Sequence, residues 1–394
     1  MPAHAALASV VHEEAGRLTA ALISILGDFH IAEEIAQDTL LVALERWPVD
    51  GVPENPAAWL FTVARRRAID QLRRDARYRE KLAQLDRPEP QEPDDRLRLI
   101  FTCCHPALAR EVQVALTLRT VCGLTTAEIA HAFLLPEATI AQRLVRARRK
   151  ITAAGIPYRV PDADELNDRL GEVLAVLYLM FNEGYLTSGG EQPERPDLTV
   201  EAEWLAALLS RLMPTEPEVM GLLALIRLHR ARAGARFDER GRLVLLRDQD
   251  RSRWDHAAIV STADLIVRVS LMRRPGPYQI QAAIVACHAE ATSWEETDWQ
   301  QILLLYDALL RHAPSPVARL NRAIARRYVD GPEAALADIE ALGGSLQRYH
   351  IYHASRAELL RDLGRHAEAR LADEAALQLT ANPAERALLE QRLA

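Results

Sequence analysis

The stretch Thr125–Lys150, TTAEIAHAFLLPEATIAQRLVRARRK, decides the local fold of the front of the chain. Thr125 and Glu128 have the spacing of a capping box, in which a hydroxyl and a carboxylate cap the first amide groups of a helix. The segment LLPEAT then turns the chain, and Pro136 suits the first turn of a second helix. The stretch therefore predicts two short helices joined by a tight turn.

The second helix of this pair is expected to have two different faces. Ile140, Leu144, Ala147 and Ile151 recur at helical spacing and would bury against the first helix. The other face is polar, and segment 143–150 carries five basic residues and no acid. A DNA major groove admits one helix, with polar side chains on base edges and Arg or Lys on phosphates. We therefore predict a DNA-binding helix, against the alternative of an ordinary solvated amphipathic helix.

A second basic cluster lies at 64–81, with eight basic and three acidic residues, just after Trp59. Basic residues near an aromatic ring suit unpaired DNA, where stacking contributes about 1–3 kcal/mol per base. For Trp59 by itself, a position in the protein core is the stronger expectation.

The bulk composition places these clusters in a multi-domain helical protein. A length of 394 residues predicts two or three domains. Aromatic residues make up only 5%, and the recurrent Ala, Leu, Arg and Glu favour helices over strands. Charge is uneven: residues 1–160 carry 21 basic and 20 acidic residues, and the remainder carries 27 and 35. The acidic net charge of −7 therefore belongs to the back of the chain.

Targeting and redox signals point to the cytoplasm. The N-terminal segment lacks a basic region followed by an apolar one, so we expect no secretory signal. The longest apolar run, 173–181, is about half of the roughly 20 residues that span a bilayer, so we expect no membrane partner. Four cysteines in so long a chain do not form a disulfide framework.

Breaker residues divide the chain into helical blocks. Helices are predicted over 5–82 with a break at 48–56, and again over 97–151 after a linker rich in Pro and acid. Beyond a hinge at 153–165, helices continue with breaks at 188–197, 213–217 and 273–277. Segment 235–254 predicts a short hairpin or an ordered loop. Segments 321–342 and 355–377 resemble each other at an offset of 33–35 residues, which matches the tetratricopeptide pattern.

Two DNA-oriented helical blocks joined by such a linker resemble the sigma-70 family of RNA polymerase sigma factors. The similarity is to the small extracytoplasmic-function type, and it covers residues 10 to about 155. It is carried by AEEIAQDTLLVAL at 32–44, NPAAWLFTVARRRAIDQLRR at 55–74 and LTTAEIAHAFLLPEATIAQRLVRARRKI at 124–151. It implies an all-α fold: region 2 at 1–85, a linker at 86–96, region 4 at 97–157 and a helical extension at 158–394.

The resemblance also implies partners and site residues. The first motif would dock on the β′ clamp helices of core RNA polymerase. The β flap of the polymerase and promoter DNA are the other partners implied. The residues implied for β′ docking share one side of a helix: Glu34, Gln37, Asp38 and Leu41. The second motif would open the −10 element, where a base is flipped into a preformed pocket, through Asn55, Trp59, Arg65, Arg66, Arg73 and Arg74. The −35 element would be read by the second helix of the opening stretch through Thr139, Gln142, Arg143, Arg146, Arg148, Arg149 and Lys150.

The long tail resembles that of a subgroup with a tetratricopeptide-like extension, whose signatures look like FTCCHPAL at 101–108 and LYLMFNEGY at 177–185. This implies regulation within the same chain, and leaves open a protein or ligand partner for the tail. We assign an interdomain contact to Phe181, Asn182, Glu183 and Tyr185. Two ways in which the tail could regulate the front domains stay open: the acidic tail covers the basic helices, or it braces the two front domains.

Other apparent sites have simpler interpretations. Cys103, Cys104 and His105 are adjacent and point in different directions on a helix, so buried packing is expected rather than a metal site. The chain has no P-loop and no dinucleotide-binding glycine motif. We expect no enzymatic activity, cofactor or metal. Two alternatives stay open at this point: a helix–turn–helix regulator that acts without polymerase, and a tetratricopeptide-type scaffold.

Overall fold

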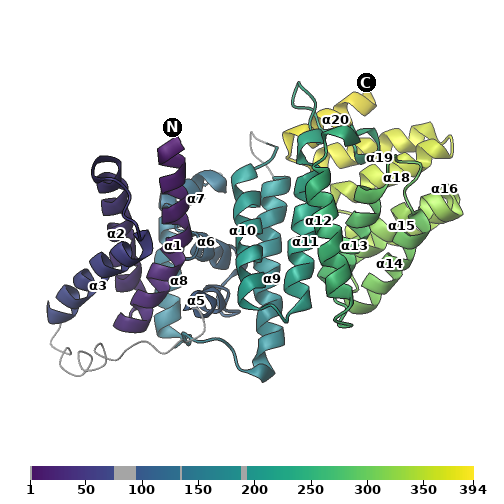
Figure 1. Ribbon diagram of the computed structural model, residues 1–394. Helices are drawn as coiled ribbons and strands as arrows, with labels where there is room; N and C mark the ends of the chain where they lie inside the picture. Colours follow the sequence, from purple (N-terminus) through teal and green to yellow (C-terminus); the bar gives the residue numbers. More distant parts are fainter. Residues whose placement is uncertain (1, 75–94, 134, 188–192) are drawn as a thin grey trace. The chain divides into compact units, whose positions relative to one another are not determined.

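The computed structural model describes residues 2–74, 95–133, 135–187 and 193–394, and over these residues the chain is built from helices (Figure 1). The expected all-α fold is therefore confirmed. Segment 235–254 forms one isolated antiparallel bridge, between Phe237 and Leu243, and short 3₁₀ turns. It is an ordered loop closed by a minimal hairpin, which is what its single glycine and short apolar run predict.

The chain divides into two compact units, Met1–Leu179 and Met180–Ala394, and the division falls inside α9. The helices of the first unit are α1 (Pro2–Leu26), α2 (Phe29–Asp50), α3 (Pro56–Arg74), α5 (Asp95–Cys103), α6 (Arg110–Thr120), α7 (Thr126–Ala132), α8 (Glu137–Ala153) and the start of α9 (Ala163–Tyr185).

In the first unit, α1, α2 and α3 pack on one another. The Asp28 side chain caps α2 by accepting hydrogen bonds from the amides of His30 and Ile31. The helix break was predicted to begin at residue 48. This boundary is wrong, because α2 continues through Pro48 to Asp50. Gly51, at a φ of 86°, ends the helix in a backbone region that favours glycine. Most of the linker predicted at 86–96 lies outside the described residues.

Helices α5 to α8 form the second part of the first unit, and α1 packs against it through α5 and α6. The contact is close at Gly16, where an added Cβ would lie 2.7 Å from the backbone oxygen of Val121. Tyr158 donates a hydrogen bond of 3.1 Å from its hydroxyl to the backbone oxygen of Ala20 in α1. Helix α1 is thus part of the core of both halves of the unit.

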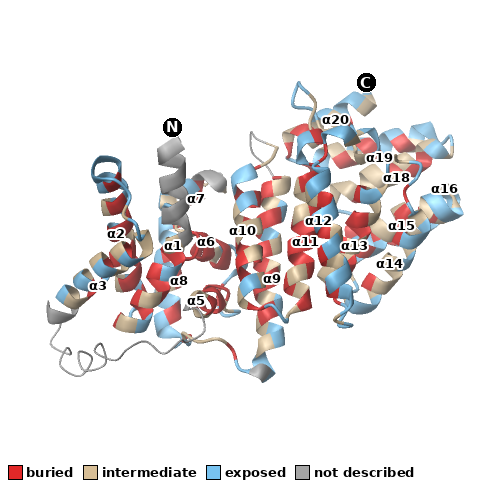
Figure 2. Cartoon of the chain, in the orientation of Figure 1, coloured by how far each residue is buried: buried red, intermediate tan, exposed pale blue. Residues whose placement is uncertain are grey.

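The helices of the second unit, after the end of α9, are α10 (Pro196–Leu212), α11 (Pro217–Ala231), α12 (His256–Ser270), α13 (Pro277–Glu290), α14 (Trp299–His312), α15 (Pro316–Asp330), α16 (Pro332–Glu340), α17 (Gly343–Leu346), α18 (His350–Asp362), α19 (His366–Leu379) and α20 (Pro383–Leu393). Helix α11 is buried along much of its length and packs on α10, α12 and α13 (Figure 2).

The internal repeat appears as two helical hairpins, α15 with α16 and α18 with α19. Their first helices begin at residues 316 and 350 and their second at 332 and 366, so both offsets are 34 residues. A buried cluster that includes Leu336, Ile339, Leu359 and Leu360 joins the two hairpins. The repeat detected in the sequence is therefore a structural repeat, and its assignment as tetratricopeptide-like stays a prediction.

Candidate nucleic-acid and protein interface

Helix α8 has the two faces that its sequence predicts. The capping box before α7 forms as expected: the Thr125 amide donates to Glu128 Oε2 at 2.7 Å, and the Glu128 amide donates to Thr125 Oγ1 at 3.1 Å. The buried residues of α8 are Ile140, Leu144, Ala147 and Ile151. The remaining face is available for a partner: Gln142, Arg146, Arg149 and Lys150 are exposed, and Thr139 and Arg143 are half-buried.

Arg148 differs from its basic neighbours, because it points to another helix of the same unit. Its Nε and Nη2 donate to the carboxylate of Glu33 in α2, at 2.9 and 2.6 Å. Arg119 of α6 donates to the same carboxylate at 3.0 Å. The Glu33 side chain is only 3% exposed, and those of the two arginines are 17–18% exposed. One buried carboxylate thus joins the first helical block to the second.

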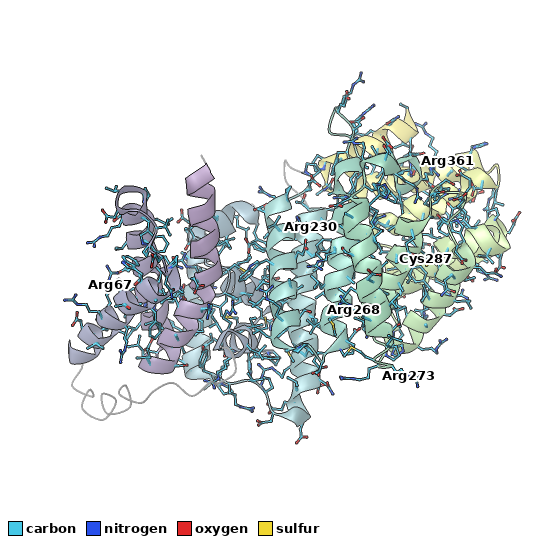
Figure 3. All side chains as sticks on the ribbon, viewed as in Figure 1. Arg67, Arg230, Arg268, Arg273, Cys287 and Arg361 are labelled. Atoms are coloured by element: carbon cyan, nitrogen blue, oxygen red, sulfur yellow. The ribbon has the colours of Figure 1, made fainter. Side chains whose placement is uncertain are left out.

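The face of α2 implied for polymerase docking points to solvent. Glu34 and Asp38 are exposed, Gln37 is half-buried, and Leu41 is 54% exposed. Asp38 lies 3.5 Å from Arg67 of α3, which Figure 3 labels. Glu33 lies one residue before this face and is buried, so α2 has one side exposed to solvent and one side packed against the rest of the chain.

The residues implied for −10 DNA lie at the start of α3 and along it. The Asn55 side chain accepts a hydrogen bond from the Ala58 amide at 3.0 Å and so caps α3. Trp59 is half-buried, with its ring 5.4 Å from that of Trp47 in an edge-to-face contact. Trp59 is thus partly packed and partly exposed, and its role in DNA binding stays a prediction.

Of the basic residues in this set, Arg65 and Arg66 are exposed on α3. Arg73 and Arg74 lie in its last turn, and their side chains are outside the described residues. The exposed pair lies on the same helix as Trp59, as the sequence motif requires.

The segment FNEGY at the end of α9 lies in the second unit. Phe181 is buried at 1% exposure, with its ring 5.3 Å from that of Tyr185. The guanidinium of Arg236 lies over the Tyr185 ring at 3.4 Å, and its Nη1 donates to the Tyr185 backbone oxygen at 2.7 Å. Asn182 is exposed and Glu183 is half-buried. The two aromatic residues therefore pack inside the second unit, and the assignment of this segment to an interdomain contact stays a prediction.

The cysteines behave as packed side chains. Cys103, Cys104 and Cys122 are buried. Burial raises the pKa of the Cys103 thiol, and it raises that of Cys104 to about 12. Among the described residues, no group of three or more His, Cys, Asp or Glu side chains is arranged to hold a metal ion. The described helices also include none that is both long and apolar enough to span a bilayer.

The sequence analysis missed the role of Glu33, although a signal was present. Glu33 lies beside Ala32, Ile35 and Ala36, which are all buried, so a charge sits on the apolar stripe of its helix. Such a charge needs a partner when it is buried. The identity of that partner could not be read from the sequence.

Three segments of the chain match models of known protein families. Family models match at residues 10–78 for sigma-70 region 2, 98–151 for sigma-70 region 4, and 169–270 for a family of unknown function, DUF6596. An uncharacterized protein of Rhizobium meliloti (strain 1021) is 46% identical over 387 residues, which is 95% of this chain and 92% of that protein.

A second relative carries a functional name. The ECF RNA polymerase sigma factor SigL of Mycobacterium tuberculosis is 35% identical over 158 residues, which is 38% of this chain and 89% of that protein. The match covers nearly all of the shorter protein and leaves more than half of this chain beyond it. Sigma-70 regions 2 and 4 imply binding to core RNA polymerase and to promoter DNA. The chain belongs to the sigma-70 family of RNA polymerase sigma factors, as an extracytoplasmic-function type with a C-terminal extension.

Proposed function

We propose that this sigma factor docks through the exposed face of α2 on the β′ clamp helices and through its region 4 on the β flap. It then opens the −10 element with α3 and reads the −35 element with α8. The observation that carries this proposal is the division of α8 into a buried apolar face and an outward polar face. Binding and positioning are its whole contribution, and the polymerase supplies the chemistry.

The exposure and the order of residues along α8 support different proposed roles for them. Gln142 is exposed in the first half of α8, where a recognition helix contacts base edges. Arg146 and Arg149 are exposed further along and supply charge for phosphates. We therefore expect Gln142→Ala to change promoter preference. Arg146→Gln should weaken binding to all promoters and lower the slope of log affinity against log salt by about 1.

In vitro transcription with core polymerase tests the proposal directly. The full-length protein should direct core polymerase to discrete start sites on genomic DNA. Asp38→Arg should abolish this activity by reversing charge on the docking face, and it should leave the circular dichroism spectrum unchanged because Asp38 is exposed. Start sites identical to those of core polymerase alone would overturn the proposal.

The ion pair between α2 and α8 supports a further step within the proposal. The labels −10 and −35 place the two elements about 25 base pairs apart, which is roughly 80 Å of duplex at about 34 Å per helical turn. The Glu33 carboxylate, however, lies 2.6 Å from Arg148 of the helix that would read the −35 element. Both elements cannot be held in that arrangement. The two regions therefore separate before or during promoter binding.

The C-terminal extension is proposed to control this step. If it inhibits, a chain that ends at Asp162 transcribes more than the full-length protein. If it braces the active form, that chain transcribes less. Arg169 of α9 donates to the backbone oxygen of Phe101 at 2.7 Å, and Glu172 pairs with Arg110 at 3.0 Å. The extension thus begins with contacts to region 4, so the truncated chain must first be shown to keep its helical content.

A further inference from the structure

An apolar cavity of about 430 Å³ lies among α11, α12 and α13 in the second unit. Its walls are mostly hydrocarbon and include Met220, Ala224, Ile266, Val269, Ala283 and Leu305. Ligand pockets typically measure about 300–1,000 Å³. An apolar cavity of this kind disfavours water and accepts apolar molecules.

Two helices approach each other closely at the cavity, through the lining residues Gly221 and Gln279. An added Cβ on Gly221 of α11 would lie 2.7 Å from the backbone nitrogen of Gln279 in α13, so the two helices nearly touch there. One turn further, α11 presents Ala224 and α13 presents Ala282 and Ala283 to the cavity. These methyl side chains are too short to fill the volume beside the contact. The cavity is therefore a property of the sequence of both helices.

Arg273 lines the same cavity and is itself exposed to solvent, so it lies at the mouth. Its φ is 54°, and within the described part of the chain it is the one non-glycine residue with a positive φ. Glycine is favoured at such a position after a helix, because a Cβ is strained there. Strained backbone tends to occur at functional sites, where the side chain has a use.

The acidic side chains near the mouth already have partners. Glu216 pairs with Arg274 at 2.9 Å. Glu218 accepts hydrogen bonds from the amides of Tyr278 and Gln279 at the start of α13. Within the described residues, no ion pair or side-chain hydrogen bond engages the Arg273 guanidinium, whereas its neighbour Arg274 is held in place. Arg273 is thus a cation at the opening of an apolar cavity.

We propose that this cavity binds a single-chain carboxylic acid, a fatty acid of medium length. Its hydrocarbon tail enters the space between α11 and α13, and its carboxylate pairs with the Arg273 guanidinium at the mouth. A guanidinium presents two parallel N–H groups that match a carboxylate. The binding itself does not depend on the proposed function. We also expect the bound acid to change promoter-directed transcription, and this expectation rests on the proposed function.

The test uses the full-length protein and sodium decanoate in isothermal titration calorimetry, below the concentration at which decanoate forms micelles. We expect saturable one-to-one binding. The neutral 1-decanol should bind at least about tenfold more weakly, because it lacks the charge that Arg273 recognises. Absence of saturable decanoate binding would overturn the proposal, and equal affinity for the alcohol would overturn the role of Arg273.

Arg273→Gly separates ligand binding from folding. Glycine adopts a φ of 54° without strain, so the melting temperature should stay the same or rise, while decanoate affinity falls about tenfold or more. The control is Arg268→Gln, which removes an exposed charge from α12 outside the cavity lining, and it should leave affinity unchanged. Figure 3 labels both arginines. Ala283→Leu should weaken the binding of both ligands by filling the cavity.

Transcription measured with and without decanoate gives an independent second readout. A decanoate-dependent change that Arg273→Gly abolishes supports a ligand-controlled extension. Decanoate binding with no change in transcription refutes the regulatory part and leaves the site itself established.

Discussion

Replacing Glu33 with Gln should favour separation of regions 2 and 4. The Glu33 carboxylate accepts three hydrogen bonds from Arg119 and Arg148, at 2.6 to 3.0 Å. Glutamine has the same shape but no charge, and its amide N–H groups would face the guanidinium donors. The substitution therefore removes an interaction that exists only while the two regions are packed together.

The size of the effect follows from burial. Removing one partner of a fully buried ion pair costs about 3–5 kcal/mol, whereas an exposed pair contributes about 0–1 kcal/mol. The Glu33 side chain is 3% exposed, but the arginines are 17% and 18% exposed and would regain some water. We therefore expect a loss of about 2–3 kcal/mol for the packed arrangement. At about 1.4 kcal/mol per factor of ten, this shifts the equilibrium about 30- to 150-fold towards separated regions.

The assay is a distance measurement by fluorescence transfer between dyes on α2 and α8 of the full-length protein, at the exposed positions Glu45 and Gln142. Glu33→Gln should lower the transfer efficiency. Transcription at limiting sigma factor should rise for the unlabelled Glu33→Gln protein, which keeps Gln142. The matched control is the same change at an exposed glutamate, Glu54→Gln, just after α2. Glu45 cannot serve as the control because it carries a dye.

A folded Glu33→Gln protein with unchanged transfer efficiency would contradict this prediction. That outcome would mean that the ion pair contributes nothing to the packing of region 2 against region 4. A rise in transcription without a change in transfer would place the effect of Glu33 elsewhere.

Other consequences can be measured separately. Gly16→Ala should destabilise the first unit by about 1–3 kcal/mol in urea unfolding, because the added Cβ would overlap a backbone oxygen. Gly171→Ala has open space around the added Cβ and should stabilise α9 by up to about 1 kcal/mol. Equal effects at the two glycines would contradict the close packing of α1. Burial and two nearby arginines lower the pKa of His288 from 6.5 to about 3. His288 therefore takes up a proton on unfolding, and below pH 6.5 it contributes a loss of stability of about 1.4 kcal/mol per pH unit as the pH falls. His288→Gln should reduce the total slope by about this amount between about pH 5.5 and 4 in denaturant titrations, and an unchanged slope would show that His288 is solvated. Cys103 and Cys104, buried with raised thiol pKa values, should react with Ellman's reagent at about pH 8 only as fast as the protein unfolds; rapid reaction of the native protein would contradict their packing.

Local patterns were sufficient for the helices that carry the interface. The capping box at Thr125 and the four apolar positions of α8 were predicted from spacing, and both appear in the structure. These features depend on residues three or four positions apart, which a helix brings together whatever surrounds it. The same reasoning failed at Pro48, because the packing of Trp47 and the glycine at 51 decide where α2 ends.

Long-range pairing required the folded chain. Glu33 pairs with Arg119 and Arg148, which lie 86 and 115 residues further along the chain. The spacing of residues within α2 cannot identify these partners. The cavity beside Gly221 likewise depends on which face of α13 approaches α11, and the φ of Arg273 depends on how the chain turns between α12 and α13. Helical spacing places a side chain on one side of its own helix. The element that covers that side is chosen by the packing of the whole unit, where burial of apolar surface and pairing of buried charge are satisfied together.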